Sequence, residues 1–178
     1  MTLWVVVCAL IALAVFVGVT FNELIASRNR VRAAWADIDV QLERRYDLIP
    51  QLAATVKGYA DHERETLTAI TDLRAKAQQE NSVAAKSPIE SQLNAQIGRV
   101  LAIQERYPDL KASENFLELQ RELVAIEDHV QAARGNYNDV VRLYNTQIQN
   151  FPDVLIAKPF GFVAAEYFQA ENTAPVKL

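Results

Sequence analysis

The chain begins with an apolar stretch whose length matches a lipid bilayer. Residues 3–21 contain no charged side chain. As a helix rising about 1.5 Å per residue, such a stretch covers about 28 Å, close to the hydrocarbon thickness of a membrane. We interpret residues 1–21 as a short tail and an uncleaved transmembrane signal anchor. A cleaved signal peptide is the alternative, but only Met1 and Thr2 precede the apolar stretch, which leaves no room for a basic n-region.

Beyond residue 21, apolar residues recur at steps of three and four, the spacing of one helix face. The most regular pattern contains nine apolar positions between Phe116 and Tyr144, and their mean spacing of about 3.5 residues favours coiled-coil-like packing. The expected fold is all-α, with the transmembrane helix followed by an elongated, antiparallel up-and-down four-helix bundle. The four helices are predicted within residues 22–150, approximately at 22–46, 49–79, 88–107 and 114–150.

Two proline-containing motifs are expected to set helix boundaries. The segment R-R-Y-D-L-I-P ends at Pro50, and proline lacks an N–H and disfavours helix at the preceding residue. Asp47 can accept hydrogen bonds at a new helix start, so we expect a tight corner here, with a kinked continuous helix as the alternative. Ser87, Pro88 and Glu90 match an N-cap, a first-turn proline and a capping box, which predicts that the third helix begins there.

Residues 151–178 change character and form a predicted aromatic and proline-rich cap and tail. In an up-and-down bundle whose first helix leaves the membrane, the fourth helix returns the chain toward the bilayer. We hypothesise that phenylalanines of this segment contact the membrane. The alternative is that they only close the open end of the core. The phenylalanines concerned are Phe151, Phe160, Phe162 and Phe168.

Composition and charge narrow the range of functions. The net charge of −4 argues against a nucleic-acid-binding protein, which normally presents a basic surface to phosphates. The single cysteine, Cys8, excludes an internal disulfide. Three arginines, Arg28, Arg30 and Arg32, follow the apolar stretch, and nothing basic except the amino terminus precedes it. The positive-inside rule therefore predicts an external N-terminus and a cytoplasmic body.

The sequence contains no recognisable catalytic or metal-binding constellation. His62 and Glu63 begin like a zinc-protease helix motif, but the position of the second histidine is occupied by Thr66. His129 has no glutamate three residues before it, as a di-iron bundle requires. No glycine-rich phosphate loop or nucleophile elbow is present. We expect no enzyme activity, no metal and no cofactor.

Four polar residues are candidate contacts to a partner or to another copy of the chain. Arg44, Arg45 and Asp47 lie at the expected corner, which an up-and-down bundle places at its membrane-distal end. Glu63 falls on the apolar seam of the second predicted helix, where a buried polar group can fix register or oligomeric state. For the three corner residues, the alternative is that they are simply solvated. For Glu63, the alternative is a partly exposed position at the edge of the seam.

Several motifs in one order resemble the LemA family of bacterial membrane proteins. The resemblance extends from residue 21 to 168, with Phe21 where the family more often has tyrosine. It implies a signal anchor, a helical bundle, no catalytic residues to carry over, and a loose association with envelope stress and membrane metalloproteases. The motifs are Trp35 with Ile38 and V-Q-L at 40–42, R-R-Y-D-L-I-P at 44–50, V-K-G-Y-A at 56–60 followed by H-E, Y-P-D-L-K-A at 107–112, and the Tyr-Asn pairs at 137 and 144.

The functional hypothesis is a single-pass protein of the bacterial cytoplasmic (inner) membrane, held in the lipid bilayer by residues 3–21. Its cytoplasmic body is expected to form homo-oligomers and to serve as a scaffold or adaptor without chemistry of its own. The alternative is a regulatory subunit that presents its membrane-distal corner to a membrane protease or an envelope-stress sensor. A scaffold should form large oligomers alone, whereas the regulatory subunit should stay small until its partner is present.

Overall fold

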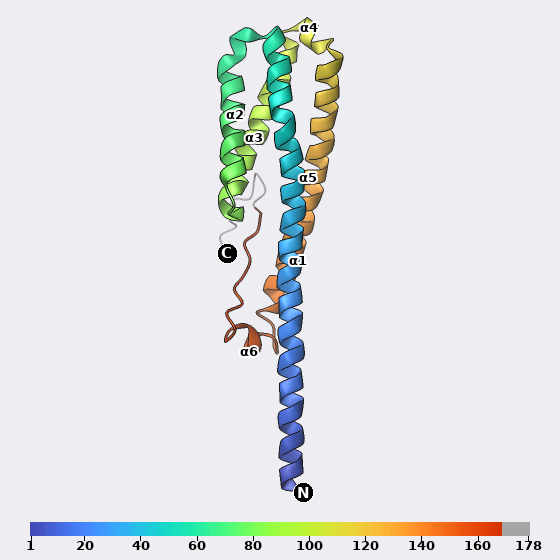
Figure 1. Cartoon of the computed structure of the whole chain (residues 1–178), viewed down its shortest axis with the longest axis vertical. Coiled ribbons are helices and arrows are strands. Elements are labelled where there is room, and N and C mark those ends of the chain that lie inside the picture. The colour runs from blue at the N-terminus through green and yellow to red at the C-terminus, as the bar shows by residue number, and fades with distance from the viewer. Residues whose placement is uncertain (169–178) are drawn as a thin grey trace, which may run out of the picture. The chain divides into compact units, whose positions relative to one another are not determined.

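The computed structural model describes residues 1–168, apart from the side chain of Asp61. The described part is all-α and contains no strand, and it begins with a long apolar helix, which confirms the predicted fold class. The last ten residues of the predicted tail, 169–178, lie outside the described residues. The helices are α1 (Thr2–Tyr59), α2 (Arg64–Gln79), α3 (Val83–Ala102), α4 (Pro108–Lys111), α5 (Glu114–Gln147) and α6 (Val154–Ala157), with 3₁₀ turns η1 (Asp61–Glu63) and η2 (Ile103–Glu105) (Figure 1).

The chain forms two compact units. Unit 1 contains residues 1–36 and 136–166, so it combines the first part of α1 with the last part of α5 and with α6. Unit 2 contains residues 37–135 together with Tyr167 and Phe168. It therefore holds the remainder of α1 and α5 and all of α2, α3 and α4.

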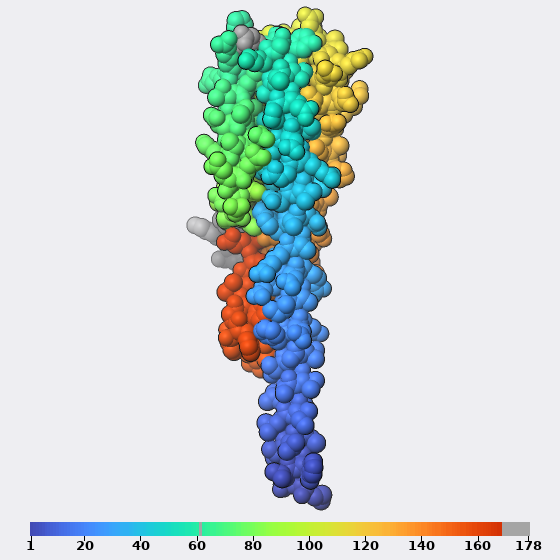
Figure 2. Space-filling view, viewed as in Figure 1, coloured from blue at the N-terminus to red at the C-terminus, as the bar shows by residue number. Residues whose placement is uncertain are grey.

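Unit 1 contains an apolar helical segment that no other part of the chain covers. An 18-residue window in α1 has a mean hydropathy of 2.8, and none of it is buried. Figure 2 shows the N-terminal end of α1 standing free of the other elements on the face in view. Leu10 and Val15 are each 60% exposed. Exposed apolar surface on this scale is unfavourable in water, so α1 carries a candidate membrane span by length, composition and exposure.

The rest of unit 1 is built by packing α5 against α1. Leu24 and Val31 of α1 are buried, as are Tyr144 of α5 and Ile148, which directly follows α5. The rings of Trp35 and Tyr137 are 5.7 Å apart in an edge-on arrangement. These residues share the faces that the steps of three and four in the sequence predict.

The structure of unit 2 does not contain the corner that was predicted at Pro50. α1 continues through Pro50 and ends at Tyr59, and the chain reverses at η1, so the alternative of a continuous helix is the one the structure adopts. Pro50 lacks the N–H that would bond the carbonyl of Tyr46. That carbonyl instead accepts a hydrogen bond from Nε of Arg74 in α2, at 2.7 Å. The corner prediction was wrong because a partner from another helix replaces the bond that the proline removes.

The predicted start of the third helix was also wrong. α3 begins at Val83, and the side chain of Ser82 accepts a hydrogen bond from the backbone N–H of Ala85 at 3.4 Å. Pro88 therefore lies inside α3, and Glu90 is buried away from any cap. α5 begins at Glu114 as predicted and ends at Gln147. The up-and-down arrangement of the whole body stays a prediction.

Candidate functional site

A buried charged cluster joins three helices of unit 2. Arg45 of α1 is only 1% exposed and forms ion pairs with Glu90 of α3 and, at 2.7 Å, with Glu127 of α5. Its guanidinium also donates to the side-chain oxygen of Asn94 at 3.4 Å. The hydroxyl of Tyr46 donates to the second carboxylate oxygen of Glu90. We call these five residues the Arg45 cluster.

The electrostatics of the Arg45 cluster favour a structural role. Burial lowers the pKa of Arg45 below its ordinary value, and the carboxylate of Glu127 partly offsets that shift. Burial also raises the pKa of Tyr46, so its hydroxyl stays a neutral donor to Glu90 at physiological pH. A buried charge is tolerated only when it is paired and hydrogen-bonded. The cluster therefore fixes how α1, α3 and α5 fit together, and no reacting group is needed to explain it.

The four candidate partner residues differ in their exposure to solvent. Arg44 and Asp47 are exposed on α1, whereas Arg45 is buried, so the expectation that a partner could reach Arg45 was wrong. Glu63 lies in η1, where its carboxylate pairs with Arg106 at 2.8 Å. Its side chain is 15% exposed. Glu63 thus ties the turn after α1 to the chain that follows α3, and it does not lie on a helix seam.

Sequence reasoning missed the partners of Arg45, although a signal was present. Glu90 precedes Leu93 and Ile97 by three and seven residues, so it lies on the buried face of α3. Arg45 follows Leu42 by three residues and precedes Ile49 by four, so it lies on the buried face of α1. Two opposite charges, each on an apolar seam, indicate a buried pair, because an isolated charge at either position would be strongly unfavourable.

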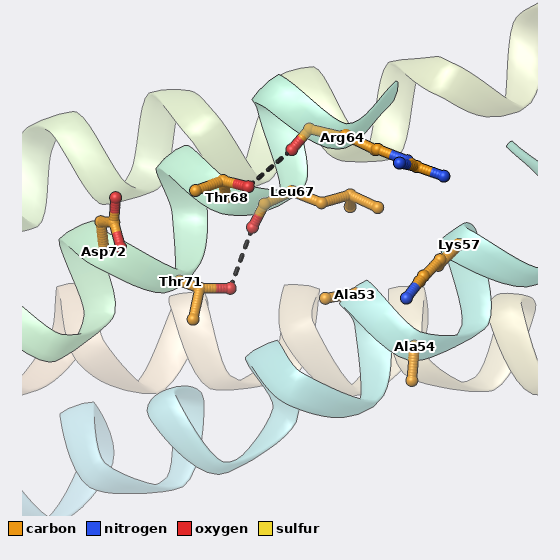
Figure 3. Close-up of a pocket in the computed structure, with 8 residues that line it drawn as sticks. All are labelled: Ala53, Ala54, Lys57, Arg64, Leu67, Thr68, Thr71 and Asp72. Atoms are coloured by element: carbon orange, nitrogen blue, oxygen red, sulfur yellow. Dashed lines mark hydrogen bonds between the residues drawn. The ribbon is translucent and has the colours of Figure 1, made fainter. Parts of the chain in front are cut away.

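Unit 2 also contains a surface groove beside the turn that ends α1. Its volume is about 540 Å³. Figure 3 shows that α1 contributes small side chains and Lys57, whereas Arg64 and the threonines come from α2. The hydroxyls of Thr68 and Thr71 donate to carbonyls of their own helix, at 2.8 and 2.9 Å. The groove is lined by Ala53, Ala54, Lys57, Arg64, Leu67, Thr68, Thr71 and Asp72.

Within residues 1–168, no group of three or more histidine, cysteine, aspartate or glutamate side chains is placed to hold a metal ion. His62 is exposed in η1 and His129 is exposed on α5. The resemblance of His62 and Glu63 to a zinc-protease motif therefore has no counterpart in the described geometry.

A second cluster lies in unit 1 at the end of the apolar segment, and we call it the aromatic cluster. The ring of Phe21 is 5.1 Å from that of Phe160 and 5.8 Å from that of Phe162. The guanidinium of Arg28 lies 5.2 Å from the centre of the Phe162 ring. Gly161 has φ of +70°, a conformation that glycine adopts without steric cost. This turn lets Phe160 and Phe162, on either side of it, both approach Phe21.

The chain after α5 is held against unit 1 by hydrogen bonds to its backbone, and we call residues 151–166 the returning segment. The side-chain amide of Asn145 donates to the carbonyl of Ala165 at 2.9 Å and accepts from its N–H at 2.8 Å. The hydroxyl of Tyr144 donates to the carbonyl of Val163 at 3.0 Å, and that of Tyr137 donates to the carbonyl of Glu166 at 2.8 Å. Burial raises the pKa of both tyrosines, so they remain donors at neutral pH.

The four phenylalanines predicted to touch the membrane differ in exposure. Phe151 is 80% exposed and Phe160 is 56% exposed. Phe162 is 8% exposed and Phe168 is 3% exposed, so both belong to the protein interior. The Phe168 ring lies 4.6 Å from the guanidinium carbon of Arg134, within unit 2. Phe162 and Phe168 therefore pack inside the protein, and the predicted membrane contact does not hold for these two residues.

Comparison with known proteins agrees with the motifs. The chain is 31% identical to Protein LemA of Metamycoplasma hominis over 153 residues, which cover 85% of this chain and 69% of that protein. It is 34% identical over 73 residues to magnetosome protein MamQ 2 of Paramagnetospirillum magneticum, covering 41% of this chain and 27% of the relative. Magnetosome protein MamQ of Magnetospirillum gryphiswaldense is 21% identical over 188 residues, covering 91% and 69% respectively.

A sequence profile described as the LemA family matches residues 34–177, which is most of the chain outside the apolar segment. The relatives and the exposed N-terminal helix together indicate a single-pass, membrane-associated protein. The chain belongs to the LemA family.

Proposed function

We propose that this protein is a membrane-anchored, self-associating helical scaffold whose body lies in the cytoplasm. The observation that carries the proposal is the construction of unit 1. There, α1 runs without interruption from its exposed apolar segment to residue 36, and α5 packs directly on it. The anchor and the protein surface above it therefore share one helix with no linker between them. Such an arrangement suits a protein that acts by position and contact.

Membrane anchoring restricts how copies can meet. Chains in one bilayer share the same orientation, so contacts form between surfaces at equal height above the membrane. A two-fold axis along the membrane normal brings a surface patch against the same patch of another copy. Confinement to the bilayer also raises the effective concentration for such contacts.

Unit 1 offers a surface patch that suits this symmetry. A groove of about 310 Å³ lies between α1 and α5, and Leu143 on its edge is 61% exposed. An exposed leucine gains by burial against the same residue of a second copy, and the polar lining gives hydrogen-bonding groups at the rim. The groove is lined by Ser27, Arg30, Val140, Leu143, Tyr144 and Gln147.

The mass of the purified full-length chain in mild detergent, measured by multi-angle light scattering, tests self-association. We expect an oligomer, and we expect Leu143→Glu to lower its mass because a charge would be buried at the contact. Asn29→Glu is the matched control, since Asn29 is also exposed in unit 1 but does not line the groove. A wild-type chain that stays monomeric at micromolar concentrations contradicts the scaffold.

One observation favours a second function, that of a regulatory subunit for a membrane protease or stress sensor. The groove beside the turn after α1 presents Lys57 and Arg64 at a surface that unit 2 leaves accessible. In that case the purified chain should have the mass of a monomer, and the mass should increase only when its partner is added. Lys57→Glu should then weaken partner binding, whereas it should leave the mass of a self-assembled scaffold unchanged.

A further inference from the structure

The returning segment of unit 1 exposes large apolar side chains that the interior of the protein does not use. Phe151 is 80% exposed, Leu155 is 59% exposed and Val163 is 75% exposed. Phe160 is 56% exposed although its ring also contacts Phe21. Large apolar side chains grouped on one exposed segment mark an interaction surface more often than they occur by chance.

The core does not account for these residues. Ile156, Ala157 and Phe162 are buried in the interior of unit 1, and the ring of Phe162 packs against that of Phe21. Their neighbours face outward, and in a segment that only closed the core we would expect them to be polar. Instead, α6 is apolar at every position, V-L-I-A, with one side buried and the other exposed.

The depth of this segment relative to a bilayer follows from α1. Phe21 is the last residue of the apolar stretch 3–21, which spans about 28 Å and so fills the hydrocarbon core. Phe21 therefore lies at the boundary between acyl chains and headgroups. The ring of Phe160 is 5.1 Å from that of Phe21, which places Phe160 at the same boundary. Figure 1 shows α6 beside this part of α1.

The returning segment is also held in place. Hydrogen bonds from Tyr144 and Asn145 fix its backbone at Val163 and Ala165. Ring contacts fix Phe160 and Phe162 against Phe21. Its exposed side chains therefore stay at a defined height beside the membrane span.

We infer that residues 151–160 bind the lipid surface, with Phe151, Leu155 and Phe160 inserted at the boundary between headgroups and acyl chains. Short apolar segments lying in the membrane interface gain free energy in proportion to the apolar area they bury. A second contact beside the span limits the tilt of α1 relative to the membrane normal. The inference rests on the membrane anchor of the proposed function but is independent of self-association.

Spin labels in vesicles test this contact. In a Cys8→Ala background, single cysteines replace Leu155 or Phe160, and the full-length chain is reconstituted in phosphatidylcholine and phosphatidylglycerol. The relative accessibility of the label to oxygen and to a water-soluble nickel complex reports depth. Val15→Cys supplies the value inside the bilayer, because Val15 lies in the apolar stretch and is 60% exposed. Asn29→Cys supplies the value in water.

We expect the labels at residues 155 and 160 to favour oxygen, with values closer to that of position 15 than to that of position 29. Circular dichroism should show unchanged helicity, so that the labels report a folded chain. Values equal to that of position 29 in a fully helical protein overturn the inference. That outcome would leave the oligomer mass unaffected, so it is distinguishable from failure of the scaffold proposal, and loss of bilayer depth at position 15 would instead remove the anchor itself.

Discussion

At the scale of single residues, the Arg45 cluster explains why a charged residue occupies a position on the apolar face of α1, which helix patterning alone does not. Arg45, Glu90 and Tyr46 are all buried, and each satisfies another's charge or hydrogen-bonding group. Desolvating such groups is costly, so the cluster is favourable only when all members are present. This makes it a strong constraint on how α1 and α3 are aligned and a weak source of net stability.

Removing one member of the cluster should therefore be much worse than removing two. We expect Arg45→Met to lower the free energy of unfolding by about 3–5 kcal/mol, because Glu90 is left buried without its cation. Adding Glu90→Met should recover most of that loss, since two apolar side chains replace the pair. Urea titration in mild detergent, followed by circular dichroism, measures both.

The control for this experiment is the adjacent arginine. Arg44 is exposed, so Arg44→Met should change the free energy of unfolding by no more than about 0.5 kcal/mol. Equal effects of Arg44→Met and Arg45→Met, or no recovery in the double variant, would contradict the assignment of Arg45 to a buried pair.

Tyr46 makes the stability contributed by the Arg45 cluster dependent on pH in the alkaline range. Burial raises its pKa in the folded state, so the folded protein holds the hydroxyl proton more tightly than the unfolded chain does. The resulting stability is fully present below the unfolded pKa of about 10 and is lost as the pH rises toward the folded pKa. Tyr46→Phe should cost about 1–3 kcal/mol at pH 7, through loss of the bond to Glu90.

The stability difference between wild type and Tyr46→Phe should consequently shrink as the pH rises above about 10. Tyr59→Phe is the matched control, because Tyr59 is 45% exposed and should matter little at any pH. Thermal unfolding across a pH series gives the comparison. A difference that stays constant up to the alkaline limit of folding would show that the Tyr46 hydroxyl is not a buried donor.

At the scale of elements, the helices were easier to predict from sequence than their boundaries. The buried residues Leu42, Leu52 and Leu123 all lie on faces that the apolar spacing predicts. The corner at Pro50 was wrong because proline rules describe a helix by itself. The carbonyl freed at Tyr46 is bonded by Arg74, which is 28 positions away in the sequence and therefore invisible to a local rule. For the same reason, the burial of Glu90 and its pairing with Arg45 were not predicted, because the local sequence around Glu90 resembles a helix cap.

The pairing of Pro50 with Arg74 can be tested as a double-mutant cycle. Arg74→Met should cost about 1.5 kcal/mol or more, because the Tyr46 carbonyl loses a charged donor. Pro50→Ala restores an N–H that can bond the same carbonyl within α1. The cost of Arg74→Met should thus be smaller in the Pro50→Ala background, as measured by urea midpoints.

Lys76→Met provides the control, since Lys76 is an exposed basic residue of the same helix. Its cost should be small and should not depend on residue 50. If Arg74→Met costs the same in both backgrounds, the arginine does not compensate for the missing N–H, and another feature must hold α1 continuous through the proline.

At the scale of the whole molecule, the sequence predicted the family, the all-α fold and the apolar segment, because these depend on long patterns and not on single contacts. It could not predict which phenylalanines would be exposed, since Phe160 and Phe162 differ by one turn around Gly161. Nor do the contacts of unit 1 set the direction in which α1 crosses the bilayer. That direction depends on charges flanking the segment.

The flanking charges lead to a prediction of orientation. Arg28, Arg30 and Arg32 follow the apolar segment within about one membrane half-thickness, and the positive-inside rule keeps such residues in the cytoplasm. A green fluorescent protein fused after Leu178 should therefore fluoresce, whereas alkaline phosphatase at the same site should be inactive, because it matures only in the periplasm. Both fusions retain the full chain, so the anchor is read in its native context.

The control fuses the same two reporters ahead of Met1, on the other side of the apolar segment. There the reporter activities should be reversed, with the phosphatase more active than it is after Leu178. Active phosphatase after Leu178 would place the body outside the cytoplasm. The scaffold would then have to act on periplasmic partners, and the exposed phenylalanines of the returning segment would meet the outer leaflet of the membrane. Because the geometry of unit 1 is the same in both orientations, this result would change the location of the function while leaving the lipid contact intact.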